Sequence, residues 1–151
     1  MIAAIRVRGT SGVTRKLRET MYMLRLHKVN HLVLVADASK KMVDKVKDYV
    51  TFGEIDENTL IALLEKRAEV QGNKKITEEF LKSKKIPSVS ELAKTIISGK
   101  KKLKDFEIEP VFRLRPPRKG YERQGIKKQF KVGGALGYRA SKINDLIARM
   151  I

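Results

Sequence analysis

The chain has 151 residues, of which 42% are hydrophobic and 34% charged, and its 34 Lys and Arg against 17 Asp and Glu give a formal net charge of +17. This length supports one modest hydrophobic core but not two independent domains, and so large a positive charge indicates a polyanionic partner. The absence of cysteine excludes disulfides and thiolate metal sites, and the lack of a long apolar run or an apolar leader predicts a soluble, cytoplasmic protein that binds no membrane.

The first third of the chain alternates between strand and helix patterns. Residues 2–8 predict a strand with Arg6 and Arg8 facing solvent, and residues 13–24 predict an amphipathic helix with a basic outer side. The apolar residues 31–35 predict a second strand, and Ser39 is a candidate N-cap for a helix over 40–50.

A third strand is expected around Phe52, which completes a β-α-β-α-β order by about residue 55. This alternation predicts an α/β sandwich with a ferredoxin-like core, in which helices pack against one face of a small sheet. Residues 1–55 form that core, residues 56–109 form a helical extension, and residues 110–151 complete one compact domain.

The helical extension contains three predicted helices of different length, and the last part of the chain returns to the core. We expect helices over 57–70, 76–81 and 88–98, the last with Ser88 and Glu91 as a capping box. Residues 111–115 then alternate like an edge strand that stops at two prolines, and residues 141–151 form a helix that docks on the body.

Between that edge strand and that helix lies the most basic stretch of the chain. Residues 113–139 hold nine Lys and Arg but one acid, Glu122, and have little apolar periodicity. Because the stretch is anchored at both ends, we interpret it as a tethered basic arm that contacts RNA phosphates, with its aromatic rings stacking or anchoring. A solvated charge run, and local packing of the rings, are the alternatives.

The predicted RNA contacts come from three parts of the chain. In the first strand and helix they are Arg6, Arg8, Arg15, Lys16 and Arg18; from the edge strand to the end of the arm they are Arg113, Arg115, Pro117, Arg118, Lys119, Arg123, Lys127, Lys128, Lys131, Gly133, Gly134, Gly137, Tyr138 and Arg139.

No motif indicates catalysis, a cofactor or a metal. The turn of residues 9–12, GTSG, follows a strand and precedes a helix, but it lacks the lysine of a phosphate-binding loop, so a simple connecting turn is favoured over a nucleotide pocket. His27 and His31 are four residues apart, yet Asn30 begins a strand and no acid completes a ligand set. We therefore expect no metal site and no small-molecule substrate.

Several ordered motifs resemble a known family. The stretch HKVNHLVLVADASKKMVDKVKDYVTFGEI from residue 27 to 55, together with LRPPRKG, FKVGGALGYR and INDLIARM, is similar to the universal large-subunit ribosomal protein family called L-thirty in bacteria and L-seven in eukaryotes. The absence of a long basic N-terminal extension resembles the archaeal type.

That resemblance implies a structural, non-enzymatic role on large-subunit rRNA, beside neighbouring ribosomal proteins. It supports RNA contact at the positions that match the family's basic, proline and glycine residues. These are Arg8, Arg115, Pro117, Arg118, Gly133, Gly134, Gly137 and Arg139. The alternatives are a free RNA-binding regulator outside the ribosome and an RNA-modifying or nucleotide-using enzyme built on the GTSG turn.

Overall fold

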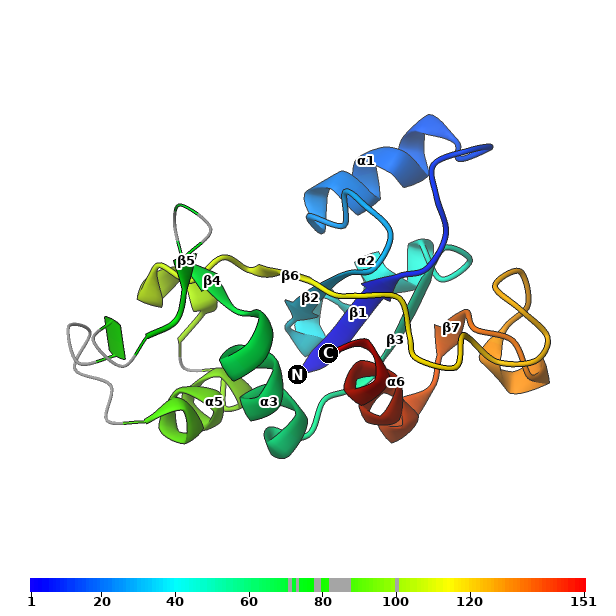
Figure 1. The fold of residues 1–151 in the computed structure, drawn as a ribbon. Coiled ribbons are helices and arrows are strands. Elements are labelled where there is room, and N and C mark those ends of the chain that lie inside the picture. The colour runs from blue at the N-terminus through cyan, green and yellow to red at the C-terminus, as the bar shows by residue number, and fades with distance from the viewer. Residues whose placement is uncertain (71, 73, 78–79, 82–87, 100) are drawn as a thin grey trace.

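The computed structural model describes the chain except residues 71, 73, 78–79, 82–87 and 100, and it is built on a mixed sheet (Figure 1). The strand order is β6-β2-β1-β3-β7. The strands are β1 (Ile2–Arg6), β2 (His31–Val35), β3 (Val50–Glu54), β6 (Val111–Arg113) and β7 (Gly137–Tyr138). β1 is antiparallel to β2 and β3, β6 is the edge strand beside β2, and β7 runs parallel to β3.

Helices α1 (Arg15–Met23) and α2 (Lys40–Lys45) cover one face of the sheet. Met21 of α1 and Val43 of α2 pack with the side chains of Ile2, Val33 and Phe52. The β-α-β-α-β order is therefore confirmed. The second helix ends five residues earlier than predicted, and Ser39 lies in a 3-10 turn, Asp37–Ser39, rather than capping α2 with its side chain.

The second face of the sheet is covered as well, by helices outside the β-α-β-α-β core, which the prediction of helices on one face did not include. Helices α3 (Glu57–Arg67), α5 (Val89–Ile97) and α6 (Ile143–Met150) share a core with Ala3 and Ile5 of β1. Figure 1 shows α6 lying against β3. Every residue of β1 is buried, including Arg6, which lies on the same face as Ile2 and Ala4 and contacts the loop after α1.

The helical extension follows the sequence in outline. Ser88 accepts a hydrogen bond from the backbone N of Glu91 at the start of α5, and Gly99 has a φ of +71° just beyond its end, as the capping pattern predicts. Helix α3 ends at Arg67, before a hairpin of β4 (Glu69–Val70) and β5 (Lys74–Lys75). The prediction for 76–81 falls partly outside the described residues.

The 114–139 segment is packed rather than free, which corrects our expectation of a loop without a core. Its backbone pairs with the end of α6, from Arg115 N to Met150 O at 3.1 Å and from Arg118 N to Arg149 O at 3.0 Å. Farther along, Leu136 donates its backbone N–H to the carbonyl of Lys128 and is buried. Backbone hydrogen bonds and turns, rather than a regular apolar stripe, hold this segment in place.

Candidate nucleic-acid interface

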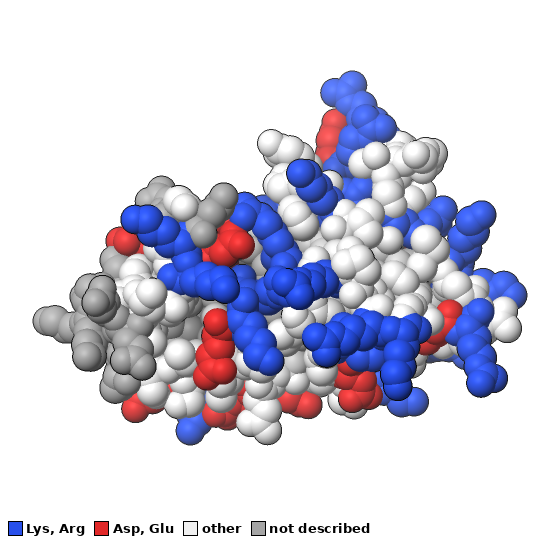
Figure 2. All heavy atoms as spheres, in the orientation of Figure 1, with Lys and Arg blue, Asp and Glu red and all other residues white. Residues whose placement is uncertain are grey.

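Exposed Lys and Arg side chains gather on the 114–139 segment and on α1. Figure 2 shows them spread across the face that carries β6, the segment after it and α1, with several Asp and Glu side chains along the lower edge of that view. We call the exposed predicted cations of these two elements the basic surface. They are Arg15, Lys16, Arg18, Arg115, Arg118, Lys119, Arg123, Lys127, Lys128 and Lys131.

Three of the predicted cations already have partners within the protein, which neutralise their charge or restrict their side chains. Arg15 forms an exposed ion pair with Glu19 at 2.8 Å, and Arg113 forms ion pairs with Glu69 and Glu109. Arg8 is half-buried; it donates to the carbonyl of Asp48 and lies over the ring of Tyr49. Because two carboxylates already neutralise Arg113, we expect phosphate contacts at the remaining exposed cations instead.

Arg6 does not face solvent, so the prediction for this residue is wrong. Its side chain is buried, and its guanidinium donates to the carbonyls of Arg8, Leu26 and His27 at 2.8–2.9 Å. Burial lowers the pKa of Arg6 below its ordinary value. The residue ties the end of β1 to the loop after α1, because a guanidinium can satisfy several backbone acceptors at once.

Arg139 is likewise a structural residue rather than an exposed RNA contact, which corrects a second prediction. Its side chain is 1% exposed. Nε donates to Thr51 Oγ1 at 2.8 Å, Nη1 and Nη2 donate to the two carboxylate oxygens of Glu122, and Nη2 also donates to the carbonyl of Ala135. The guanidinium carbon lies 4.4 Å from the centre of the Phe130 ring. These contacts join the 114–139 segment, called the basic segment below, to β3.

Glu122 is the residue that the sequence interpretation passed over. Burial alone would raise the pKa of this carboxyl, but the hydrogen bond and charge of Arg139, with smaller contributions from a backbone hydrogen bond and Arg149, outweigh burial and lower it below its ordinary value. Arg149 of α6 approaches the same carboxylate at 3.4 Å. The signal was present in the sequence, since a lone acid among nine cations is a natural internal counterion.

The remaining predicted positions shape the segment itself. A Cβ on Gly134 would lie 2.2 Å from the carbonyl oxygen of Lys128. The glycine therefore lets two parts of the protein's own backbone pack closely together. Gly137 has a φ of +79°, and its carbonyl accepts from Thr51 Oγ1. Pro117 is buried, whereas Gly133 is exposed. Tyr138 is 39% exposed, and its hydroxyl donates to Glu54.

The GTSG turn and the two histidines form no evident chemical centre. The turn is exposed at its glycines, and Thr14 precedes α1 without a side-chain capping bond. Within the described ranges, no group of three or more His, Cys, Asp or Glu side chains is placed to hold a metal ion. In the same ranges, no helix is both long and apolar enough to cross a membrane.

Comparison with known proteins identifies the family of the chain. The family model described as Ribosomal protein L30p/L7e matches residues 2–50, which cover β1 to the start of β3. A protein of Methanococcus maripaludis named Large ribosomal subunit protein uL30 is 56% identical over 99% of this chain and 98% of its own length. Proteins of the same name from Nanoarchaeum equitans and Thermoplasma volcanium are 50% and 46% identical over 100% of this chain, and over 99% and 93% of their own lengths. Since relatives this similar match the chain from end to end, the chain belongs to the L30p/L7e family of ribosomal proteins.

Proposed function

We propose that the chain is a structural constituent of the large ribosomal subunit, where it binds and stabilises large-subunit rRNA and catalyses no reaction. The observation that carries this proposal is the end-to-end match to relatives named as large-subunit ribosomal proteins. In this role the chain works in the cytoplasm, with rRNA and neighbouring ribosomal proteins as its partners.

The distribution of charge supports rRNA as the main partner. The chain carries a formal charge of +17, and the exposed cations of the basic surface lie on two elements far apart in sequence, α1 and the 114–139 segment. Cations that neutralise phosphates release condensed counterions, which supplies most of the sequence-independent affinity for RNA. Phosphate contacts position a protein on its nucleic acid rather than read its sequence.

The internal contacts of the basic segment support a rigid interface. Arg139 and Glu122 join the segment to β3, and the backbone bonds to Met150 and Arg149 join it to α6. A segment that is already ordered loses less conformational entropy on binding, so more of its contact energy contributes to affinity. In this proposal the buried pair orders the segment and the exposed cations contact RNA.

Mass spectrometry of sucrose-gradient fractions from the source cells tests the proposal. We expect the chain in one-to-one ratio with other large-subunit proteins in the large-subunit peak, and retained there after a moderate salt wash. Its presence only in the light fractions would refute the ribosomal role and favour a free RNA-binding regulator.

A further inference from the structure

A cavity of about 190 Å³ lies between the end of α2 and residues 129–138. Its walls include the rings of Phe52, Phe130 and Tyr138 and the side chain of Leu136. The rings of Phe52 and Tyr138 are tilted, with their centres 5.6 Å apart. A single water molecule needs only about 10–15 Å³ of such space, so the cavity has room for a small planar ring system.

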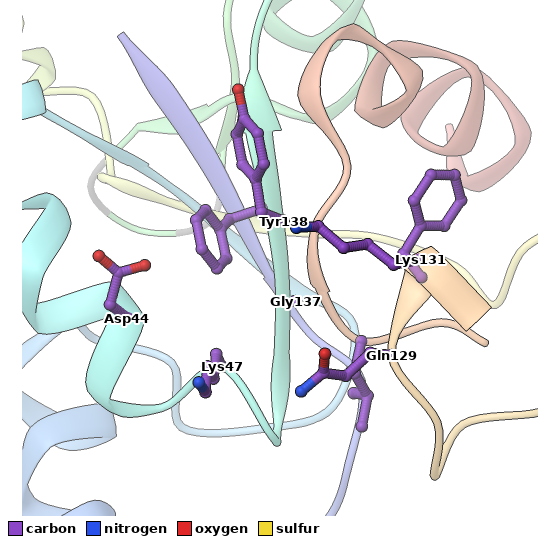
Figure 3. Close-up of a pocket in the computed structure, with 9 residues that line it drawn as sticks. Asp44, Lys47, Gln129, Lys131, Gly137 and Tyr138 are labelled. Atoms are coloured by element: carbon purple, nitrogen blue, oxygen red, sulfur yellow. The ribbon is translucent and has the colours of Figure 1, made fainter. Parts of the chain in front are cut away.

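Four polar side chains surround this apolar space. Asp44 and Lys47 come from the α2 side and Gln129 and Lys131 from the opposite side, and Figure 3 shows the amide of Gln129 directed across the gap toward Lys47. In the part of the chain that the structure describes, none of these four side chains has a hydrogen-bond or ion-pair partner. Their donors and acceptors are therefore available to a ligand.

The aromatic walls are fixed before any ligand binds. The hydroxyl of Tyr138 donates to the carboxylate of Glu54 at 2.7 Å, and Lys40 Nζ lies 5.0 Å from the centre of the Tyr138 ring. Phe130 is held by the buried guanidinium of Arg139. An apolar cavity with a few convergent polar groups and preformed walls is the usual form of a small-ligand site.

We propose that this cavity receives the base of one unpaired nucleotide of the large-subunit rRNA, an inference that rests on the proposed function. Unpaired bases in RNA complexes insert among aromatic side chains and are recognised through hydrogen bonds on their edges. Lys47 and Lys131 flank the cavity and supply positive charge for the phosphates on either side of the base.

Asp44 determines which bases the cavity accepts. A carboxylate only accepts hydrogen bonds, so it favours adenine, cytosine and guanine, which present an exocyclic amino group, over uracil, which presents only its N3–H as a donor. The amide of Gln129 both donates and accepts, and so it can complete the contact with any of the three.

Replacing Asp44 tests the proposal, because a purely electrostatic interface and a base-binding cavity predict opposite changes in rRNA affinity. If the basic surface acts only through charge, Asp44→Ala removes a repulsive carboxylate, and rRNA affinity rises or stays the same. If Asp44 holds a base, the same change lowers affinity by about tenfold. Asp48→Ala is the matched control, since Asp48 is also exposed and lies four residues further along but does not line the cavity.

The experiment uses the full chain and transcribed large-subunit rRNA, with affinity measured by filter binding and base exposure by dimethyl sulfate and kethoxal footprinting. We expect the parent chain to protect an unpaired A, C or G that Asp44→Ala leaves reactive, while other protections persist and Asp48→Ala behaves like the parent. Equal or tighter binding by Asp44→Ala, with an unchanged footprint, would overturn the nucleotide site but leave the proposed function intact. Failure of the parent chain to bind rRNA would overturn both.

Discussion

Replacing Arg139 by Met is expected to destabilise the folded chain by about 3 kcal/mol. The change removes the hydrogen bonds to Thr51, Glu122 and Ala135 and leaves a partly buried carboxylate without its main partner. Breaking a buried ion pair costs about 3–5 kcal/mol. The lower end applies because the Glu122 side chain is 20% exposed and Arg149 stays at 3.4 Å from it. At about 2–4 °C per kcal/mol for a chain of this size, the melting temperature falls by about 6–12 °C.

Urea denaturation followed by circular dichroism measures this loss, with Arg118→Met as the control because Arg118 is exposed and its side chain has no partner among the described residues. The pKa of Glu122 is lowered in the folded chain, so its pairing stabilises the fold above the ordinary carboxyl pKa and that stabilisation disappears as the pH falls through the folded value. The difference in the free energy of unfolding between Arg139→Met and the parent should therefore become smaller in acid. A difference in the free energy of unfolding below about 1 kcal/mol at pH 7 would refute a structural role for the Arg139–Glu122 pair.

Three further predictions concern the fold and the basic surface. Arg6→Met leaves the carbonyls of Leu26 and His27 without their donor, and denaturant melts should show a loss of about 1–3 kcal/mol, which unchanged stability would contradict. Gly134→Ala places a Cβ against the Lys128 carbonyl and should cost about 1–3 kcal/mol by the same assay; full stability would mean that the segment packs differently. Replacing Arg115, Arg118, Lys127 and Lys128 together by Ser should leave the melting temperature nearly unchanged, because these side chains are exposed. In rRNA titrations the parent's log–log salt slope should lie near −5 to −9, flattening by about three to four units in this variant, and an unaltered slope would place the interface elsewhere.

The regular elements could be predicted because they carry apolar patterns. Residues 31–35 form a strand at the predicted positions, and α6 buries Ile143, Leu146, Ile147 and Met150 at the predicted helical spacing. The second face of the sheet was missed because alternation in one strand does not reveal what later segments pack on it. Helices α3, α5 and α6 cover a face whose residues, such as Ala3 and Ile5, look the same in a one-sided sheet.

The RNA contacts of the candidate site remain a prediction, and the structure corrects the expected exposure of two of its arginines, Arg6 and Arg139. A charged residue in an alternating strand is ordinarily assigned to solvent, but Arg6 lies where three carbonyls converge and Arg139 where a carboxylate, a hydroxyl and an aromatic ring meet. Such convergence depends on residues as far as 88 positions away, as in the bond between Arg139 and Thr51. No local pattern encodes it. The lone acid Glu122 was the one clue within the segment itself.

Because the basic segment packs between β3 and α6, it reaches its folded position after the strands of the core have paired during protein synthesis. Strands β1, β2 and β3 lie within the first 54 residues and can pair once they have emerged. The segment, in contrast, donates backbone hydrogen bonds to the carbonyls of Arg149 and Met150 in α6, which follows it in the chain. Contacts between residues distant in sequence form late, because loop closure must precede them. A nascent chain therefore presents its basic segment in final form only after α6 has been made, which separates folding of the core from the ability to bind RNA.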